Sequence, residues 1–88
     1  MEKNNQQLFF DWLDGSERTV LNYKNAINST YLKTVLKTMF DTSNLFDLSD
    51  LVQLWQMYSF VKQDDNNVRN HRIYSSAIMK YMRFQIMV

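Results

Sequence analysis

The sequence predicts an all-α fold, a compact bundle of four to five helices in which residues 1–88 form a single helical domain. Apolar residues recur at helical spacing in successive segments, as expected for amphipathic helices. The chain is 45% hydrophobic and can bury a core, while one Gly and no Pro leave little turn chemistry for a sheet protein. A chain of 88 residues is also short enough for one core.

The first two helices are expected on either side of the single glycine. In residues 8–13, LFFDWL, apolar side chains follow the i, i+3/i+4 pattern of a short amphipathic helix, which Gly15 can end in a left-handed conformation. Ser16 can then cap the second helix with its side-chain oxygen. Val20, Tyr23 and Ile27 mark its inner face. Its outer face comprises Arg18, Asn22, Asn25 and Ser29.

Two further helices are expected in the middle of the chain. Residues 28–30, NST, predict a break, because these side chains compete for backbone hydrogen bonds and can cap a new start. The third helix follows, and residues 41–44, DTSN, predict a loop. Asp47 or Ser49 is expected to cap the fourth helix.

The fourth helix, DLVQLWQMYSFVK, is predicted to be the most buried element. Its core stripe comprises Leu51, Leu54, Trp55, Tyr58 and Val61, widened by Met57 and Phe60. Truncation within this stripe, as in Trp55→Ala, is therefore expected to cost roughly 3–5 kcal/mol of stability.

The last helix is expected to start from a cap at Asp65 or Asn67 and to run to about Gln85. Its core stripe comprises Tyr74, Ala77, Ile78, Tyr81 and Phe84. Its opposite face comprises Arg72, Ser76, Met79 and Arg83, with Arg69 and Lys80 alongside.

Charge alternates along the chain in blocks, although the net charge is only +1. Acids predominate in residues 1–17 and 41–65, whereas residues 18–40 and 66–88 contain none. The basic residues of these two acid-free blocks are Arg18, Lys24, Lys33, Lys37, Arg69, Arg72, Lys80 and Arg83. Positive charge is therefore expected to gather on particular helix faces.

Residue composition argues against an enzyme that acts by itself. His71 is the single His, there is no Cys, and one Gly cannot build a phosphate-binding loop. Asp64 and Asp65 are adjacent, so their carboxylates diverge and a capping loop is the better interpretation. No catalytic residue, metal or cofactor is expected. The absence of Cys and of a long apolar run predicts a soluble, cytoplasmic protein without membrane contact.

The acid-free faces favour double-stranded DNA as the partner. A helix fits the major groove, where Arg and Lys reach phosphates or guanine and Asn pairs with adenine. The candidate DNA-binding residues are Arg18, Asn22, Asn25, Lys33, Lys37, Arg69, Arg72, Ser76, Lys80 and Arg83. The alternative is that these residues have no partner, because solvated helix faces must be polar and basic residues are favoured near helix C-termini.

Two segments resemble the N-terminal SAM-like domain of phage-type integrases, the tyrosine recombinases. SERTVLNYKNAI, which opens with Ser16, Thr19 and Tyr23, is similar to the Ser/Thr-x-x-Thr-x-x-x-Tyr helix of that family. HRIYSSAIMKYMRF resembles the aromatic-rich closing helix. A similar Tyr-Ser-x-Ala-x-x-x-Tyr segment precedes nuclease domains in some restriction-type endonucleases, and Tyr74 and Tyr81 match its ends.

The resemblance implies a four- or five-helix bundle that clamps one side of duplex DNA, with the second and last helices facing the DNA. The catalytic domain of such a recombinase or nuclease would lie elsewhere in the parent protein. The chain ends on RFQIMV without a polar tail, which is typical of a fragment of a larger protein. The rival hypothesis is a helical protein-interaction or self-association module. Its patch would comprise Met57, Phe60, Met79 and Met82.

Overall fold

Every element of secondary structure in residues 5–13 and 15–87, the parts that the computed structural model describes, is helical. In chain order the elements are α1 (Asn5–Trp12), α2 (Glu17–Ile27), α3 (Thr30–Phe40), the 3-10 helix η1 (Leu45–Asp47), α4 (Leu51–Lys62), α5 (Asp65–Arg69) and α6 (Ile73–Met87). The described ranges hold no strand, and the expected all-α class is confirmed. They hold six α-helices, rather than four to five.

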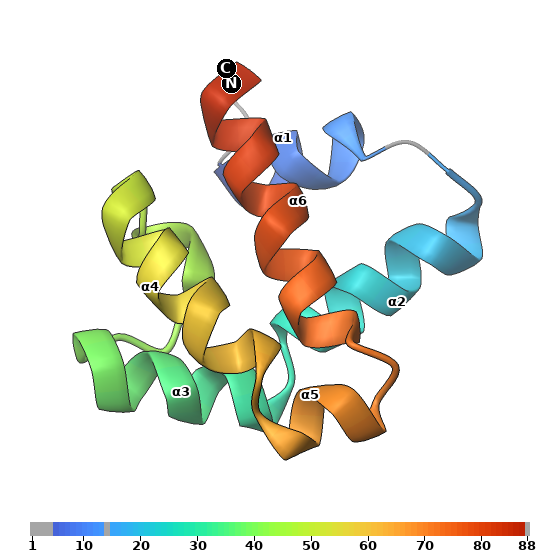
Figure 1. Cartoon of the computed structure of the whole chain (residues 1–88). Helices are drawn as coiled ribbons and strands as arrows, with labels where there is room; N and C mark the ends of the chain where they lie inside the picture. The colour runs from blue at the N-terminus through green and yellow to red at the C-terminus, as the bar shows by residue number, and fades with distance from the viewer. Residues whose placement is uncertain (1–4, 14, 88) are drawn as a thin grey trace.

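Helix α6 lies at the centre of the bundle and packs against α1, α2, α4 and α5 (Figure 1). It runs beside α4 in the opposite direction, and the C-terminal half of α2 crosses its first turns (Figure 1). The core stripe expected on this helix is confirmed at Ala77, Ile78, Tyr81 and Phe84, whereas Tyr74 is half-buried. On the opposite face Arg83 is exposed, whereas Ser76, Met79 and Lys80 are half-buried.

Aromatic rings fasten α1 to the end of α6. Phe9 is fully buried, and its ring centroid lies 5.4 Å from that of Tyr81 and 5.5 Å from that of Phe84. Edge-to-face ring pairs of this kind add stabilisation beyond the burial of apolar area. The hydroxyl of Tyr81 donates a hydrogen bond of 2.9 Å to the carbonyl of Leu48, so this buried ring also holds the segment before α4.

Local capping explains where α2 and α3 begin. Gly15 adopts a positive φ of 139°, which L side chains rarely allow, and this fits the glycine expected after the first helix. The hydroxyl of Ser16 accepts the amide of Thr19 at 3.2 Å, which confirms Ser16 as the cap of α2. The hydroxyl of Ser29 accepts the amide of Leu32 at 3.2 Å, so the break expected at NST is confirmed.

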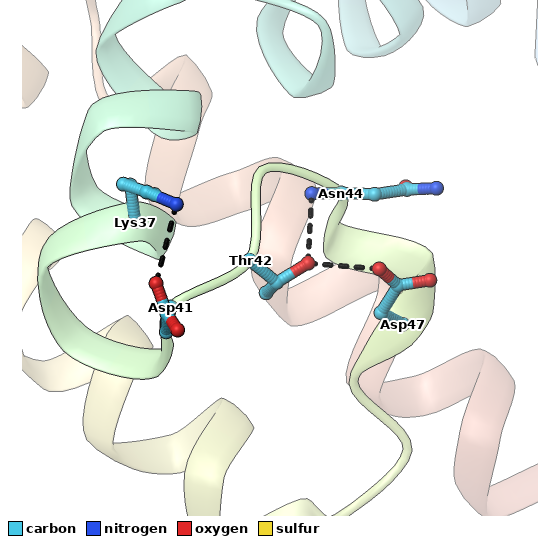
Figure 2. Close-up of polar contacts among 5 residues, drawn as sticks. All are labelled: Lys37, Asp41, Thr42, Asn44 and Asp47. Atoms are coloured by element: carbon cyan, nitrogen blue, oxygen red, sulfur yellow. Dashed lines mark hydrogen bonds and ion pairs between the residues drawn. The ribbon is translucent and has the colours of Figure 1, made fainter.

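The loop after α3 is ordered by its own polar side chains (Figure 2). Asp41 ends the helix in the left-handed conformation, with φ of 57°, and its carboxylate lies 3.2 Å from the ammonium of Lys37. The hydroxyl of Thr42 donates to the carboxylate of Asp47 at 2.8 Å and accepts the amide of Asn44 at 3.3 Å. The loop expected from the DTSN run is confirmed.

The cap of α4 differs from the one expected. Asp50 caps this helix, with its carboxylate 2.8 Å from the amide of Val52, whereas Asp47 and Ser49 were the expected caps. Asp47 closes the turn η1 instead, and its carboxylate already accepts the hydroxyl of Thr42. The start of α4 was therefore expected slightly too early in the chain.

The expectation of one continuous last helix is wrong, because a turn at residues 70–72 divides it into α5 and α6. His71 and Arg72 both take left-handed φ values, 56° and 61°. Asn67 stabilises this turn: its carbonyl accepts the amide of Arg72 at 2.7 Å, and its buried side chain accepts the amide of Ser75 at 3.0 Å. Asn67 thus satisfies an amide in the first turn of α6 that has no partner within the helix.

Helix α4 is less buried than its composition predicts. Its inward face comprises Leu54, Met57 and Val61. Its outward apolar residues are Leu51, Val52, Trp55 and Phe60, which are 41%, 65%, 54% and 48% exposed. Packing against α6 covers one side of the helix, and the apolar residues around the rest of its circumference are not enclosed. The expected core roles of Leu51, Trp55 and Phe60, and the large cost of Trp55→Ala, are therefore wrong.

The apolar patch expected for a protein partner does not form as a unit. Met57 and Met82 are buried in the core, Met79 is half-buried and Phe60 is exposed. Among the described residues, no helix is long and apolar enough to cross a membrane.

Candidate nucleic-acid interface

A hollow of about 240 Å³ runs along the outward face of α6 and is called the α6 hollow below. It is lined by Tyr23 of α2, Tyr58 of α4, and Ser75, Ser76, Met79, Lys80 and Arg83 of α6. Ser76, Lys80 and Arg83 fall at i, i+4 and i+7, so a single helix face presents them together. Arg83 is exposed and Lys80 is half-buried, which lets the lysine stem pack while its ammonium reaches the hollow.

A second hollow, of about 400 Å³, lies where α2 meets the turn before α6 and is called the amide hollow below. It is lined by Asn22, Asn25, Ala26, Ser29, Asn70, His71, Ile73 and Tyr74. Asn22 and Asn25 are exposed, as are Asn70 and His71. The Ser29 hydroxyl is engaged, since it donates to the carbonyl of Ala26 at 2.6 Å. The side-chain nitrogen of Asn70 also donates, to the carbonyl of Asn66 at 2.7 Å. The side-chain amides of Asn22 and Asn25 and the imidazole of His71 are therefore the main groups with donors and acceptors to offer.

Both hollows are lined by residues of α2 and of α6, and these two helices pack against each other, although no residue lines both hollows. No Asp or Glu is among the residues that line either of them. Neither hollow is enclosed by a lid, so an extended polymer has access to both. Of the predicted DNA-binding residues, Asn22 and Asn25 thus line one hollow and Ser76, Lys80 and Arg83 line the other. The two hollows together are called the candidate surface below.

The structure does not bring Lys33 and Lys37 into either hollow. Both are exposed on α3 and line a shallow depression with Thr30, Thr34, Thr38 and Ser43. Lys37 is also paired with Asp41 (Figure 2). Exposed pairs of this kind contribute little to stability, but they lower the positive potential that a lysine offers to a partner.

The remaining predicted arginines, Arg18, Arg69 and Arg72, line neither hollow. Arg18 is exposed in the first turn of α2, and Arg69 is exposed in the last turn of α5. Arg72 was expected to begin the basic face of the last helix. It belongs instead to the left-handed turn before α6, so it does not continue the line of Ser76, Lys80 and Arg83.

Sequence reasoning missed the aromatic part of this surface. Tyr58 lines the α6 hollow beside Lys80 and Arg83, and its ring stacks on that of Trp55 with centroids 5.5 Å apart and planes 29° apart. The ammonium of Lys62 lies 5.8 Å from the Tyr58 ring centroid. The i, i+3, i+7 spacing of Trp55, Tyr58 and Lys62 is a signal for a shared face, but the apolar pattern of this helix assigns Trp55 and Tyr58 to the core.

Within residues 5–13 and 15–87, no group of three or more His, Asp or Glu residues is arranged to hold a metal ion. Comparisons with protein-family models, with curated proteins and with solved structures find no match for this chain.

Proposed function

We propose that this chain is a DNA-binding module that contacts duplex DNA through the outer faces of α2 and α6. The observation that carries the proposal is a pair of hollows beside two packed helices, neither lined by a carboxylate, one holding Lys80 and Arg83 and the other Asn22 and Asn25. Cationic side chains fix a protein on the phosphate backbone, whereas amide side chains read base edges.

The resemblance of two segments to phage-type integrases supports the same proposal. It implies that the second and last helices face DNA, and these are the helices that border the two hollows. We therefore propose the SAM-like integrase N-terminal type for the bundle and a cytoplasmic location. The module binds and does not catalyse, while an active site belongs to the recombinase or nuclease of which it is a part.

Salt-dependent binding tests this function. A labelled duplex titrated at several salt concentrations should bind with log K falling by about 0.9 per phosphate contact for each unit of log salt. The double variant Lys80→Gln/Arg83→Gln should weaken binding and reduce the slope by about 2, because two phosphate contacts are lost. Glutamine keeps much of the stem length, so the packing of Lys80 is preserved.

The matched control is Lys33→Gln/Lys37→Gln, which removes the same charge from α3. It should change affinity and slope much less, since these lysines lie outside both hollows. Equal losses in the two double variants would contradict a defined surface on α6 and leave only diffuse attraction between charges.

A protein-interaction module is the second candidate function, and the exposed apolar residues of α4 favour it. Leu51, Val52 and Trp55 present their side chains to solvent. The mass in solution discriminates the two functions. A dimer with no response to duplex DNA at low salt would favour self-association, whereas a monomer that binds DNA would favour the first proposal.

A further inference from the structure

Trp55 is exposed in a way that the core does not explain. The other tryptophan, Trp12, is half-buried, with its ring 5.7 Å from that of Phe84 and 6.1 Å from that of Phe9. Trp55 is 54% exposed, and its ring is backed by Tyr58. A large flat ring that is supported from one side and open on the other is suited to stack on another flat ring.

This ring lies next to positive charge. Tyr58, which backs Trp55, also lines the α6 hollow together with Lys80 and Arg83, and Lys62 lies over the Tyr58 ring. The stacked rings of Trp55 and Tyr58, with the Lys62 ammonium over the Tyr58 ring, therefore meet the cationic α6 hollow at Tyr58. A ligand that carries phosphates and, close to them, a flat apolar ring could place its phosphates in the α6 hollow and stack its ring on Trp55.

We infer that Trp55 is a stacking site for an unpaired nucleobase of a DNA strand whose phosphates lie against Lys80 and Arg83. This inference rests on the proposed function and narrows it to DNA with a single-stranded end or an extruded base. A base inside a duplex has both faces covered by its neighbours, so only an unpaired base can reach the indole. Stacking of this kind tolerates any base, because every base has a π-face.

The surrounding charge argues against a second copy of the chain as the occupant. A two-fold symmetric contact places the same patch of both copies face to face. Such a contact on α4 and α6 would bring the Lys62, Lys80 and Arg83 side chains of both copies together without an acid among the residues of the α6 hollow. A polyanion with exposed bases has the complementary charge.

The test compares two labelled hairpins that differ only in a short thymine overhang. Fluorescence anisotropy should show that the unchanged protein binds the overhang hairpin more tightly, by on the order of tenfold for one stacked base. Trp55→Ala should remove this preference, because it should lower the affinity for the overhang hairpin much more than the affinity for the blunt hairpin. Trp55→Phe should restore part of the preference, because phenylalanine keeps a smaller ring.

Two further measurements make the result specific to the ring. Leu51→Ala truncates another exposed apolar residue of α4 and should keep the preference for the overhang. Intrinsic fluorescence should be quenched by the overhang hairpin in the unchanged protein and not in Trp55→Phe. Since Trp55 is half exposed, both of its variants are expected to fold, and far-UV circular dichroism verifies this.

Equal affinity of the unchanged protein for the two hairpins would overturn the inference, as would an equal loss on both hairpins in Trp55→Ala. Either result leaves the proposed function standing when Lys80→Gln/Arg83→Gln still weakens binding to the blunt hairpin. If neither hairpin binds and the protein is a dimer that Trp55→Ala dissociates, both the inference and the proposed function fail.

Discussion

Asn67 is a fully buried polar residue that organises the start of the central helix. Its side-chain oxygen accepts the amide of Ser75, and its side-chain nitrogen lies 2.9 Å from the hydroxyl of the same serine. The hydroxyl of Ser75 also donates to the carbonyl of Arg72 at 3.1 Å. Because buried polar groups are costly when they lack partners, this small network fixes the turn between α5 and α6.

Asn67→Ala should lower the free energy of unfolding by roughly 2–4 kcal/mol, since it removes two hydrogen bonds and leaves a buried amide without its partner. Urea unfolding followed by circular dichroism measures this loss. The control is Asn66→Ala, in the same short helix but exposed, which should cost no more than about 0.5 kcal/mol. Similar costs for the two variants would show that the network contributes little.

Sequence reasoning anticipated single residues where the physical cause is local. Ser16 and the NST run were identified correctly because a cap bonds an amide two or three residues away. Asn67 was expected to cap a last helix that begins directly after it. Its partner is eight residues further on, across a turn with two left-handed residues, His71 and Arg72. Only His is of a type enriched in that conformation, and enrichment alone does not predict two such residues in a row.

At the level of elements, a side-chain hydrogen bond joins the start of α3 to the N-cap residue of α5. The hydroxyl of Tyr31 donates to the carboxylate of Asp64 at 2.6 Å, and the same carboxylate caps α5. Burial, together with the bond to Asp64 and the negative charge of that residue, raises the pKa of Tyr31 well above its ordinary value. The bond holds the ends of two helices that lie far apart in the sequence.

This raised pKa predicts a defined dependence of stability on pH. A group whose pKa is higher in the folded state contributes stability that is complete below its unfolded pKa of about 10 and is lost as the pH rises above that value. Tyr31→Phe should cost about 1 kcal/mol at neutral pH through the lost hydrogen bond. The free energy of unfolding, measured by urea titration between about pH 9 and pH 11, should then fall less steeply for the variant. Parallel curves for the two proteins would contradict this role.

The orientation of helices was harder to predict than their existence. On α2 the apolar stripe is narrow, so its inner face and the outward positions Asn22 and Asn25 could be derived from periodicity. On α4 apolar residues surround the axis, and periodicity cannot say which of them the neighbours cover. The exposed ring of Trp55, and with it the aromatic part of the candidate surface, was therefore missed.

At the level of the whole molecule, one helix holds the core together. Helix α6 contacts α1, α2, α4 and α5, and rings of α1 and α6 interlock around Phe9. No helix of the described parts has a separate core of its own, since the buried apolar residues form one cluster. Loss of any one contact with α6 should therefore weaken all the others.

Unfolding should consequently be a single cooperative transition. In a Trp55→Phe variant the fluorescence comes from Trp12, whose ring packs on Phe84, so it reports on the contact between α1 and α6. The urea midpoint from this fluorescence should coincide with the midpoint from far-UV circular dichroism, which reports on all helices. Separate midpoints would mean that α1 detaches before the remaining helices melt.

The distribution of charge along the chain indicated the candidate surface better than the net charge did. The acid-free blocks 18–40 and 66–88 contain α3, α6 and all of α2 except Glu17, and α2 and α6 border the candidate surface. The third, α3, carries its lysines elsewhere, which sequence proximity could not reveal. Which helices become neighbours depends on packing between distant segments, and no local pattern encodes it.

The central position of α6 also bears on the order of events during synthesis. Helices α1 to α5 leave the ribosome before α6, yet the core that includes Phe9 and Leu54 closes only around residues of α6. Until then the nascent chain exposes apolar surface to solvent, and chaperones or aggregation compete for it. A rare codon or a stall just before Ile73 would lengthen that exposed interval, so the yield of folded protein should respond to translation speed at this one point.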